Sequence, residues 1–427
     1  MPLSGAHILL FPFVIIAYQV VFQQLEKERW WAHFFSFSLF WQIVMDNHII
    51  YIGGFDLPDN NAAALRVIGN SKIFCKLGYS VSLIGLSRSI SKPVSFKYEE
   101  FDCCNLPYPN SVMQWYKYLT SISQYLPFLK QNKPKMVIAY NHPAIALQKL
   151  VDYCKKNGIK IISDCTEWYE PKGNPIFKLV KGWDVRKRMY DVHSQFDGII
   201  AISRYLYEFY SKRNLKTLFI PPLVDIQEDK WKQTIGANED DTIRIIFSRA
   251  FSRGNKDGID LVIEALEAVY KRNDINAFSL DVVGMNQADF ARISSRQSPI
   301  HSFVHFHNHI PHQGLIQKLK QADFQIFIRN NSLANEAGFP TKFVESISSK
   351  TMVLTNPSSN LGDYMKEGVN SFCLNINTFE DLVESLSQPL RMSKKEIMER
   401  RSKMDITTFD YRNYTTDMES FLSKIIC

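Results

Sequence analysis

Residues 48–78, HIIYIGGFDLPDNNAAALRVIGNSKIFCKLG, contain a strand, a loop and a helix in immediate succession. The β-branched run at 48–52 predicts a buried strand, and Gly53-Gly54 predict a tight turn at its end. Apolar side chains then recur near helical spacing at Leu65, Ile68, Phe74 and Leu77. Because Gly78 follows where a C-terminal cap is expected, the stretch predicts the first unit of a parallel α/β sheet.

The same alternation of strands and helices continues through the rest of the chain. In the first half we expect strands at residues 48–52, 81–85, 136–140, 160–163, 198–202 and 218–220. Pro221-Pro222 and the polar stretch 225–241 then indicate an exposed connection between domains. A second series of strands is expected at residues 243–247, 279–283, 303–306, 324–328, 352–355 and 371–374. The fold class predicted is α/β, with two Rossmann-like domains facing each other across a cleft and helices at the C-terminus.

This pattern divides the chain into an N-terminal extension at 1–44, Rossmann-like domains at 45–222 and 223–407, and a C-terminal helix at 408–427. We expect the last helix to pack back towards the first domain. The apolar run at 6–22 is slightly short for a membrane span, and charged residues follow it at 26–29. Residues 1–44 therefore form either a weak anchor or interfacial helix, or a segment upstream of a true start at Met45. No basic residue precedes the apolar run, which disfavours a signal peptide.

Composition narrows the class of protein. With 45% hydrophobic and 22% charged residues, the chain of 427 residues can bury a sizeable core. Its seven cysteines form no disulfide framework and no zinc spacing, which favours a reducing cytoplasm. The net charge of +7 suits an anionic lipid or a phosphorylated substrate. Since no RNA-binding signature is present, nucleic acid is not expected as a partner.

Three loops that follow predicted strands could bind a phosphate. Gly53-Gly54 allow close approach of backbone N–H groups, although such a pair is more often an ordinary turn. Arg253 and Lys256 flank Gly254 before the helix expected at 259–269, where cations could pair with a diphosphate or lie in a solvated loop.

The third loop, residues 335–345 (NEAGFPTKFVE), is the most specific of the three. Pro340 suits the first turn of a helix, and Gly338-Phe339 precede it. The helix start at Thr341 and Lys342 would offer free N–H groups to an anion. Glu345, about one turn further, could accept hydrogen bonds from two ribose hydroxyls.

Seven segments resemble, in order, those of bacterial family 4 glycosyltransferases from capsular and other surface-polysaccharide loci. They are GGFDLPDNNAAALRV, AYNHPAIALQKLVDYC, SDCTEWYE, GIIAISRYL, IPPLVD, NKDGIDLVIEAL and AGFPTKFVESI. The resemblance runs from about His48 to the C-terminus. It implies a GT-B fold and transfer from a nucleotide-sugar co-substrate with retention of configuration, without a metal or other cofactor. It also implies a first domain for a lipid-linked or glycan acceptor, a second for the donor, and a place at the inner face of the plasma membrane.

The resemblance also assigns roles to particular residues. Glu345 matches the second glutamate of the family's Glu-x7-Glu motif, which holds the ribose, and Lys256 matches the diphosphate-binding lysine, with Arg253 as its companion. Gly53-Gly54 match the glycines that approach the phosphates from the other domain. The first glutamate of the motif falls on Ala337, so Glu336 or a backbone amide near Gly338 is expected to substitute.

Candidates for the reacting centre lie after strands of the first domain. Asp164 or Glu167 could orient the acceptor hydroxyl or act as the base, and Asp164 could instead cap a turn. His142 is a further candidate. The histidines at 305, 307 and 309 are expected to be structural, because a zinc site needs better-grouped ligands.

Residues 177–193, FKLVKGWDVRKRMYDVH, interleave aromatic and aliphatic side chains with five cations. Such a helix suits an anionic membrane surface, although its apolar face could equally pack on the sheet. Two other functions share the architecture, a nucleotide-sugar 2-epimerase and a catalytically silent partner subunit. An epimerase would need no acceptor, whereas a silent subunit would bind nucleotide without transferring sugar.

Overall fold

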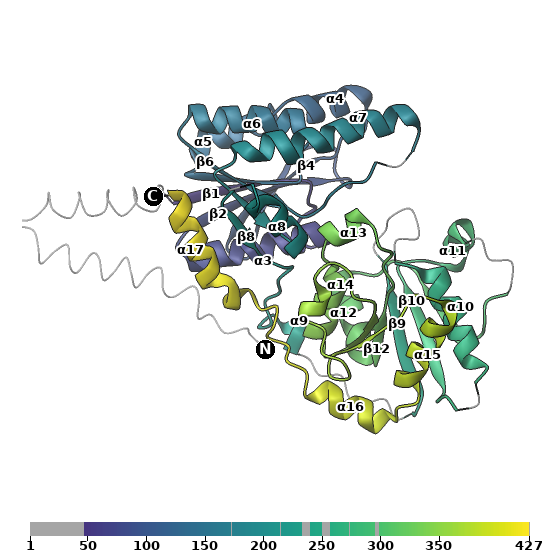
Figure 1. Cartoon of the computed structure of the whole chain (residues 1–427). Helices are drawn as coiled ribbons and strands as arrows, with labels where there is room; N and C mark the ends of the chain where they lie inside the picture. Colours follow the sequence, from purple (N-terminus) through teal and green to yellow (C-terminus); the bar gives the residue numbers. More distant parts are fainter. Residues whose placement is uncertain are drawn as a thin grey trace, which may run out of the picture.

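The computed structural model describes residues 47–426, apart from 172, 214, 233–239, 250–256, 273 and 295–298. Two lobes lie one above the other in Figure 1, each built on its own sheet. The predictions for residues 1–44, and those for Arg253 and Lys256, fall outside the described residues. None of the helices in the described part of the chain has the length and apolar content needed to cross a bilayer.

The described part of the first lobe holds an eight-stranded sheet of order β3-β4-β2-β1-β5-β6-β7-β8. Its strands are β1 (His48–Gly53), β2 (Ser80–Ser87), β3 (Val94–Tyr98), β4 (Phe101–Pro107), β5 (Met136–Tyr140), β6 (Lys160–Cys165), β7 (Gly198–Ala201) and β8 (Thr217–Phe219). All neighbours pair parallel except β3, which runs antiparallel to β4. The sequence did not predict β3 and β4, because polar residues and Cys103-Cys104 break the β-branched pattern there. Both cysteines are buried in β4.

Helices cover both faces of this sheet. They are α3 (Ala62–Lys76), α4 (Val112–Thr120), α5 (Leu126–Asn132), α6 (Ala144–Lys156), α7 (Pro175–Arg186) and α8 (Arg204–Ser211). A π-helical turn at Lys187–Val192 continues α7. Alternate residues of β1 point to opposite faces: Ile50 and Ile52 pack with the α6 side, whereas Ile49 and Tyr51 pack with α3. The strand is therefore apolar on both faces, as the run at 48–52 predicts.

The second lobe has a six-stranded parallel sheet among its described residues, in the Rossmann order β11-β10-β9-β12-β13-β14. Its strands are β9 (Ile243–Ser248), β10 (Phe278–Val283), β11 (Val304–His307), β12 (Phe324–Ile326), β13 (Met352–Thr355) and β14 (Ser371–Cys373). Its helices are α10 (Ile259–Tyr270), α11 (Gln287–Ile293), α12 (His312–Gln321), α13 (Leu333–Ala337), α14 (Thr341–Ser348), α15 (Phe379–Leu390) and α16 (Lys394–Ser402). The predicted fold class of two Rossmann-like domains is confirmed.

The chain crosses between the lobes twice, and the two crossings lie together. Val224 of the first crossing donates its N–H to Phe409 O and accepts from Tyr411 N. After the second crossing, α17 (Thr415–Ile426) contacts α3 and β8 of the first lobe (Figure 1). A side chain at Gly198 of β7 would meet Phe421 and Ile425 of α17 within 2.7 Å. The C-terminal helix thus completes the core of the first domain.

Candidate active site between the two domains

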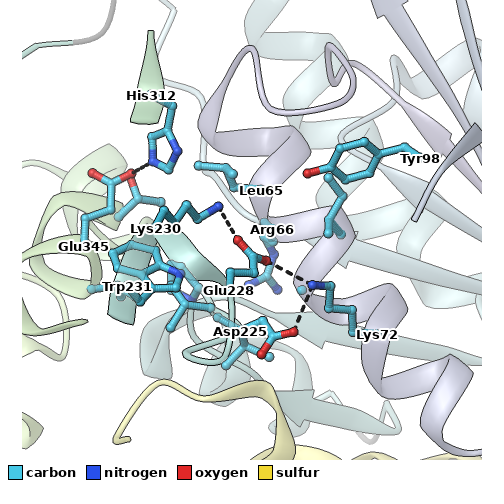
Figure 2. Close-up of a pocket in the computed structure, with 17 residues that line it drawn as sticks. Leu65, Arg66, Lys72, Tyr98, Asp225, Glu228, Lys230, Trp231, His312 and Glu345 are labelled. Carbon is cyan, nitrogen blue, oxygen red and sulfur yellow. Dashed lines mark hydrogen bonds and ion pairs between the residues drawn. The ribbon is translucent and has the colours of Figure 1, made fainter. Parts of the chain in front are cut away.

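A pocket opens between the lobes, where α3 and the first crossing face α12 and α14 (Figure 2). Leu65 and Lys72 of α3 line one side, and Thr341 and Glu345 of α14 line the other. The short helix α9 (Asp229–Lys232) supplies Trp231. Both Rossmann-like domains therefore contribute side chains to one cavity, which is the arrangement the sequence predicts for the donor cleft.

Glu345 is the predicted site residue with the clearest position in this pocket. Its carboxylate Oε1 lies 3.0 Å from His312 Nε2, and both side chains are close to nine-tenths buried. His312 Nδ1 and the indole Nε1 of Trp231 are also buried and have no hydrogen-bond partner in the part of the chain that the structure describes. Buried polar atoms normally have partners, so these two atoms mark the pocket as a place for a polar ligand.

A charged cluster closes the other end of the pocket. Lys72 Nζ lies 3.0 Å from carboxylate oxygens of Glu99, Asp225 and Glu228 (Figure 2 draws the last two contacts). Burial alone would lower the pKa of Lys72, but these carboxylates outweigh it and raise the pKa above its ordinary value. Lys230 is held 2.5 Å from Glu228. The predicted exposure of the connection at 225–241 is thus wrong for its first part, where Trp231 is buried and Asp225 is ion-paired.

The glycine loop of the first domain lies at the carboxyl end of β1. A Cβ on Gly53 would come within 2.5 Å of Tyr140 O on the adjacent strand β5, so only glycine fits. Gly54 is exposed, whereas Phe55 and Leu57 are fully buried. The loop is therefore fixed by its apolar residues, and Gly54 presents backbone at the sheet edge.

The loop before α14 divides into two groups of residues. Pro340 precedes the first residue of α14, and no side chain caps the helix there. Thr341 and Glu345 line the pocket. Lys342 instead lies 2.6 Å from Asp257 and over the Phe247 ring, while Phe339 packs on Tyr364 and Phe409. The side chains of Phe339 and Lys342 are thus committed to the second domain, contrary to the prediction that both contact the donor.

Glu336 lies where the two domains touch. Its carboxylate accepts the N–H of Ser359, a residue with a left-handed backbone, at 3.1 Å. Ala337 O next to it accepts from Ser203 Oγ of the first domain at 2.8 Å, and a side chain at Gly338 would approach Thr166 O to 3.9 Å. Glu336 therefore stabilises the loop, and its proposed contact with the transferred sugar remains a prediction.

Asp164 does not fit its predicted role as a base. Its carboxylate is completely buried and lies 2.7 Å from Arg66 Nη2 and 2.5 Å from the Tyr51 hydroxyl, which donates to it. Every oxygen is thus engaged inside the first domain, out of reach of an acceptor hydroxyl. Glu167, three residues after Asp164 and beyond the end of β6, is exposed and stays a candidate. The predicted structural role of the histidine cluster agrees with His307, which lies 2.7 Å from Asp281.

Sequence reasoning missed Arg66, Trp231 and His312. Arg66 occupies an ordinary helical position, and nothing in its neighbours indicates a buried partner 98 residues away. Trp231 lies in a polar stretch of sequence. A single tryptophan in such a stretch was the one local sign that this residue could be buried. His312 follows Pro311 at the start of α12, where a loop leads from a strand to a helix. Ligands of parallel α/β sheets bind at such loops, so this position was a possible signal.

Comparison with known proteins supports this arrangement. Residues 227–405 match the family model of glycosyl transferases group 1. No curated protein matches the chain by sequence.

Solved structures extend the likeness to both domains. A trehalose-6-phosphate synthase studied for glycosyl transfer with retention has 12% identity and a TM-score of 0.61, covering 88% of this chain and 99% of that one. The Anabaena protein HepE, solved with UDP and glucose, has 11% identity and a TM-score of 0.57, covering 88% and 99%. The lipopolysaccharide outer core galactosyltransferase WaaB has 14% identity and a TM-score of 0.56, covering 87% and 99%.

At these identities the structures show the fold alone, and the family model shows the class of enzyme. The chain is therefore a glycosyltransferase with the GT-B fold, and its residues 227–405 match glycosyl transferases group 1.

Proposed function

We propose that the protein transfers a sugar from a nucleoside-diphosphate sugar, with retention of configuration, to a lipid-linked or glycan acceptor of a surface polysaccharide. The observation that carries this proposal is the position of Glu345. Its Oε1 contacts His312, and the residue lines the pocket between the domains. A carboxylate so placed can accept from the vicinal hydroxyls of a ribose.

The neighbouring residues suit a nucleoside. Trp231 offers an aromatic face, and its N–H and one ring nitrogen of His312 have no partner among the described residues; both side chains line the pocket with Glu345. A nucleobase binds to such a combination of apolar surface and a few polar groups. The donor's nucleoside would therefore lie between α9, α12 and α14.

The diphosphate would lie at the N-terminus of α14. The first-turn N–H groups of that helix have no side-chain cap, and they favour an anion. Lys256 and Arg253 belong to the loop that leads into α10, and we expect them to bind the same phosphates. Because negative charge grows on the leaving diphosphate as the sugar bond breaks, these groups would stabilise the transition state without a metal.

Relatives of the same fold agree with this chemistry. One was studied for transfer with retention, one holds UDP and glucose, and one is named for a lipopolysaccharide outer core. These properties belong to those proteins, and here they support the donor class and the surface-polysaccharide role.

The test is donor binding and turnover by the full chain with UDP-, GDP-, dTDP- and CMP-sugars, with and without a chelator. Glu345→Ala should weaken binding of the preferred donor by about 1.5–3 kcal/mol, the worth of hydrogen bonds to a charged group. Glu264→Ala, at an exposed position of α10, should bind donor like the wild type. Wild-type affinity in Glu345→Ala would contradict the site, and conversion of donor without any acceptor would favour an epimerase.

We also propose that α7 docks the enzyme on the anionic inner face of the plasma membrane. This helix is described in full, and it buries Asp184 and Val185 alone. Ile176 and Leu179 are 77% and 76% exposed, and Phe177, Val180 and Trp183 are about half exposed. Apart from the buried Val185, these apolar residues of α7 therefore face away from the core. Cations interleaved with them suit an anionic bilayer.

Vesicle binding tests this docking. Lys178→Gln, Lys181→Gln and Lys187→Gln together should weaken binding to phosphatidylglycerol-rich vesicles by roughly 1 kcal/mol per cation. Neutral phosphatidylcholine vesicles should show little difference between the proteins. The pair Lys155→Gln and Lys156→Gln, exposed at the end of α6, serves as the charge control. Equal loss of binding in the control would show that net charge alone is responsible.

A further inference from the structure

The carboxylate of Glu345 has one side-chain partner among the described residues, and that partner is a histidine from another helix. His312 Nε2 lies 3.0 Å from Glu345 Oε1 (Figure 2). His312 is the first residue of α12 and Glu345 is the fifth residue of α14, so the contact joins two helix starts. Only 12% and 11% of the two side chains are exposed. The carboxylate is thus held from one side within the pocket.

The imidazole of His312 makes no second hydrogen bond within the part of the chain that the structure describes, because its buried Nδ1 has no partner there. A buried histidine that serves the fold normally has both ring nitrogens satisfied by the protein. His193 in the first domain is an example: Nε2 lies 3.2 Å from Ser163 Oγ, and Nδ1 lies 2.5 Å from the Tyr210 hydroxyl. The polar contact of His312 is therefore directed to Glu345.

The direction of this hydrogen bond follows from the chemistry of the two groups. A carboxylate oxygen accepts, so the hydrogen lies on Nε2 and His312 donates it. Hydrogen bonds to a carboxylate are shorter and stronger than those between neutral groups. A glutamate side chain has several rotatable bonds and loses much freedom when it is ordered. The bond from His312 therefore orders the carboxylate before a ligand binds, which lowers the entropic cost of binding.

The cations that line the pocket have other partners. Lys230 points towards Glu228 and lies 2.5 Å from it (Figure 2). Lys72 lies 3.0 Å from carboxylates at the other end of the pocket, and Arg66 is ion-paired inside the first domain. The histidine is thus the side chain that fixes the orientation of the Glu345 carboxylate.

We propose that His312 is a positioning residue, which orients the Glu345 carboxylate to accept the 2′- and 3′-hydroxyls of the donor's ribose. This role rests on the proposed function, which puts the nucleoside beside Glu345. A carboxylate has about four acceptor positions, so one bond from His312 leaves room for two hydroxyls. A site built to bond a hydroxyl rejects an analogue that lacks it, because a polar group of the site then stays unpaired. The donor is accordingly a ribonucleotide sugar, and a 2′-deoxyribonucleotide sugar is a poor ligand.

The experiment measures the affinity of the full chain for UDP, GDP and CMP, each beside its 2′-deoxy analogue. In the wild type the best ribonucleotide should bind roughly 10- to 100-fold more tightly than its analogue, as expected for a hydrogen bond to a charged group. His312→Gln and His312→Asn form a matched pair, because the Gln amide reaches the position of Nε2 and the Asn amide reaches only that of Nδ1. Asn should reduce the ribose preference about fivefold or more, whereas Gln should keep most of it.

Two controls accompany this pair. His305→Gln, at an exposed position of β11, should bind every nucleotide like the wild type. In a Glu345→Ala protein, His312→Asn should cause no further loss of affinity, because a positioning residue acts through the carboxylate. The melting temperatures of both His312 variants should stay close to that of the wild type, since the ring makes no other hydrogen bond with the described residues.

Four results would overturn the proposal. They are a wild type that binds nucleotide without preferring ribose, an unchanged preference in both His312 variants, an equal loss in both, and a further loss from His312→Asn in the Glu345→Ala protein. The last result would show that the histidine acts independently of the carboxylate. Failure of both variants to fold would also count against the proposal, since it would assign the histidine to the fold. Failure of the proposed function is distinct, because the wild type would then bind none of the nucleotides.

Discussion

Two arginines of the first domain, Arg66 and Arg188, are both almost completely buried, but they differ in the number of hydrogen bonds that the chain provides to their guanidinium groups. Arg66 bonds Asp164 through Nε and Nη2, and its Nη1 donates to the carbonyls of Ile220 and Pro221. All its nitrogens are satisfied by the chain. Arg188 has an edge that the described residues leave without partners. The comparison separates a buried charge that the chain pairs at every nitrogen from one whose Nε and Nη2 have no partner among the described residues.

The position of Arg66 explains why its ion pair with Asp164 lies in the interior of the first domain. The carbonyls that it contacts belong to the end of the first domain, immediately before the crossing to the second. Asn70 and Tyr51 complete the group around Asp164. The cluster thus links β1, α3, β6 and the start of the first crossing in the interior of the domain.

The largest expected effect is loss of stability in Arg66→Met. Removing one partner leaves the buried Asp164 carboxylate uncompensated, which should cost about 3–5 kcal/mol. Calorimetry should show a lower melting temperature for the first domain. The double variant Arg66→Met, Asp164→Leu should recover part of the loss, because it removes both charges. A single variant as stable as the wild type would remove the distinction between the two arginines.

The next effect is a dependence of stability on pH through His142. Its pKa in the folded protein is about 4, below the ordinary value of 6.5, so the unfolded chain binds the additional proton between these values. Stability is therefore unaffected by His142 above pH 6.5. Below pH 6.5 the free energy of unfolding falls by about 1.4 kcal/mol per pH unit, so that roughly 3 kcal/mol is lost by pH 4. His142→Phe should flatten this part of the profile. An unchanged slope would show that His142 is not buried neutral.

The smallest effect concerns Lys72, a third buried cation with an intermediate environment. Its three carboxylate partners are partly exposed, at 31%, 13% and 24% of their side chains. Water can therefore replace the lysine, and Lys72→Met should cost about 1–2 kcal/mol, less than Arg66→Met. Salt should reduce the difference from the wild type. A loss equal to that of Arg66→Met would show that partner exposure does not govern these pairs.

Much of the fold follows from local patterns. The run at 48–52, the glycines after it and the helix at 62–77 are set by neighbours in sequence, and the structure reproduces them in β1 and α3. The same holds for the start of α14 after Pro340. By contrast, β3 and β4 form an edge pair stabilised by β2, and no local signal indicated them.

The candidate site divides in the same way. The sequence by itself determined the class of fold, the glycine loop after β1 and the position of Glu345 one turn into a helix, because each depends on short-range spacing. Only the tertiary structure decided which charged side chains form ion pairs inside the protein. Asp164 meets Arg66 across 98 positions and Lys342 meets Asp257 across 85. Whether a buried charge is satisfied depends on these long-range contacts, and so the partner of Asp164, and the absence of one for Arg188 among the described residues, could not be read from neighbouring residues.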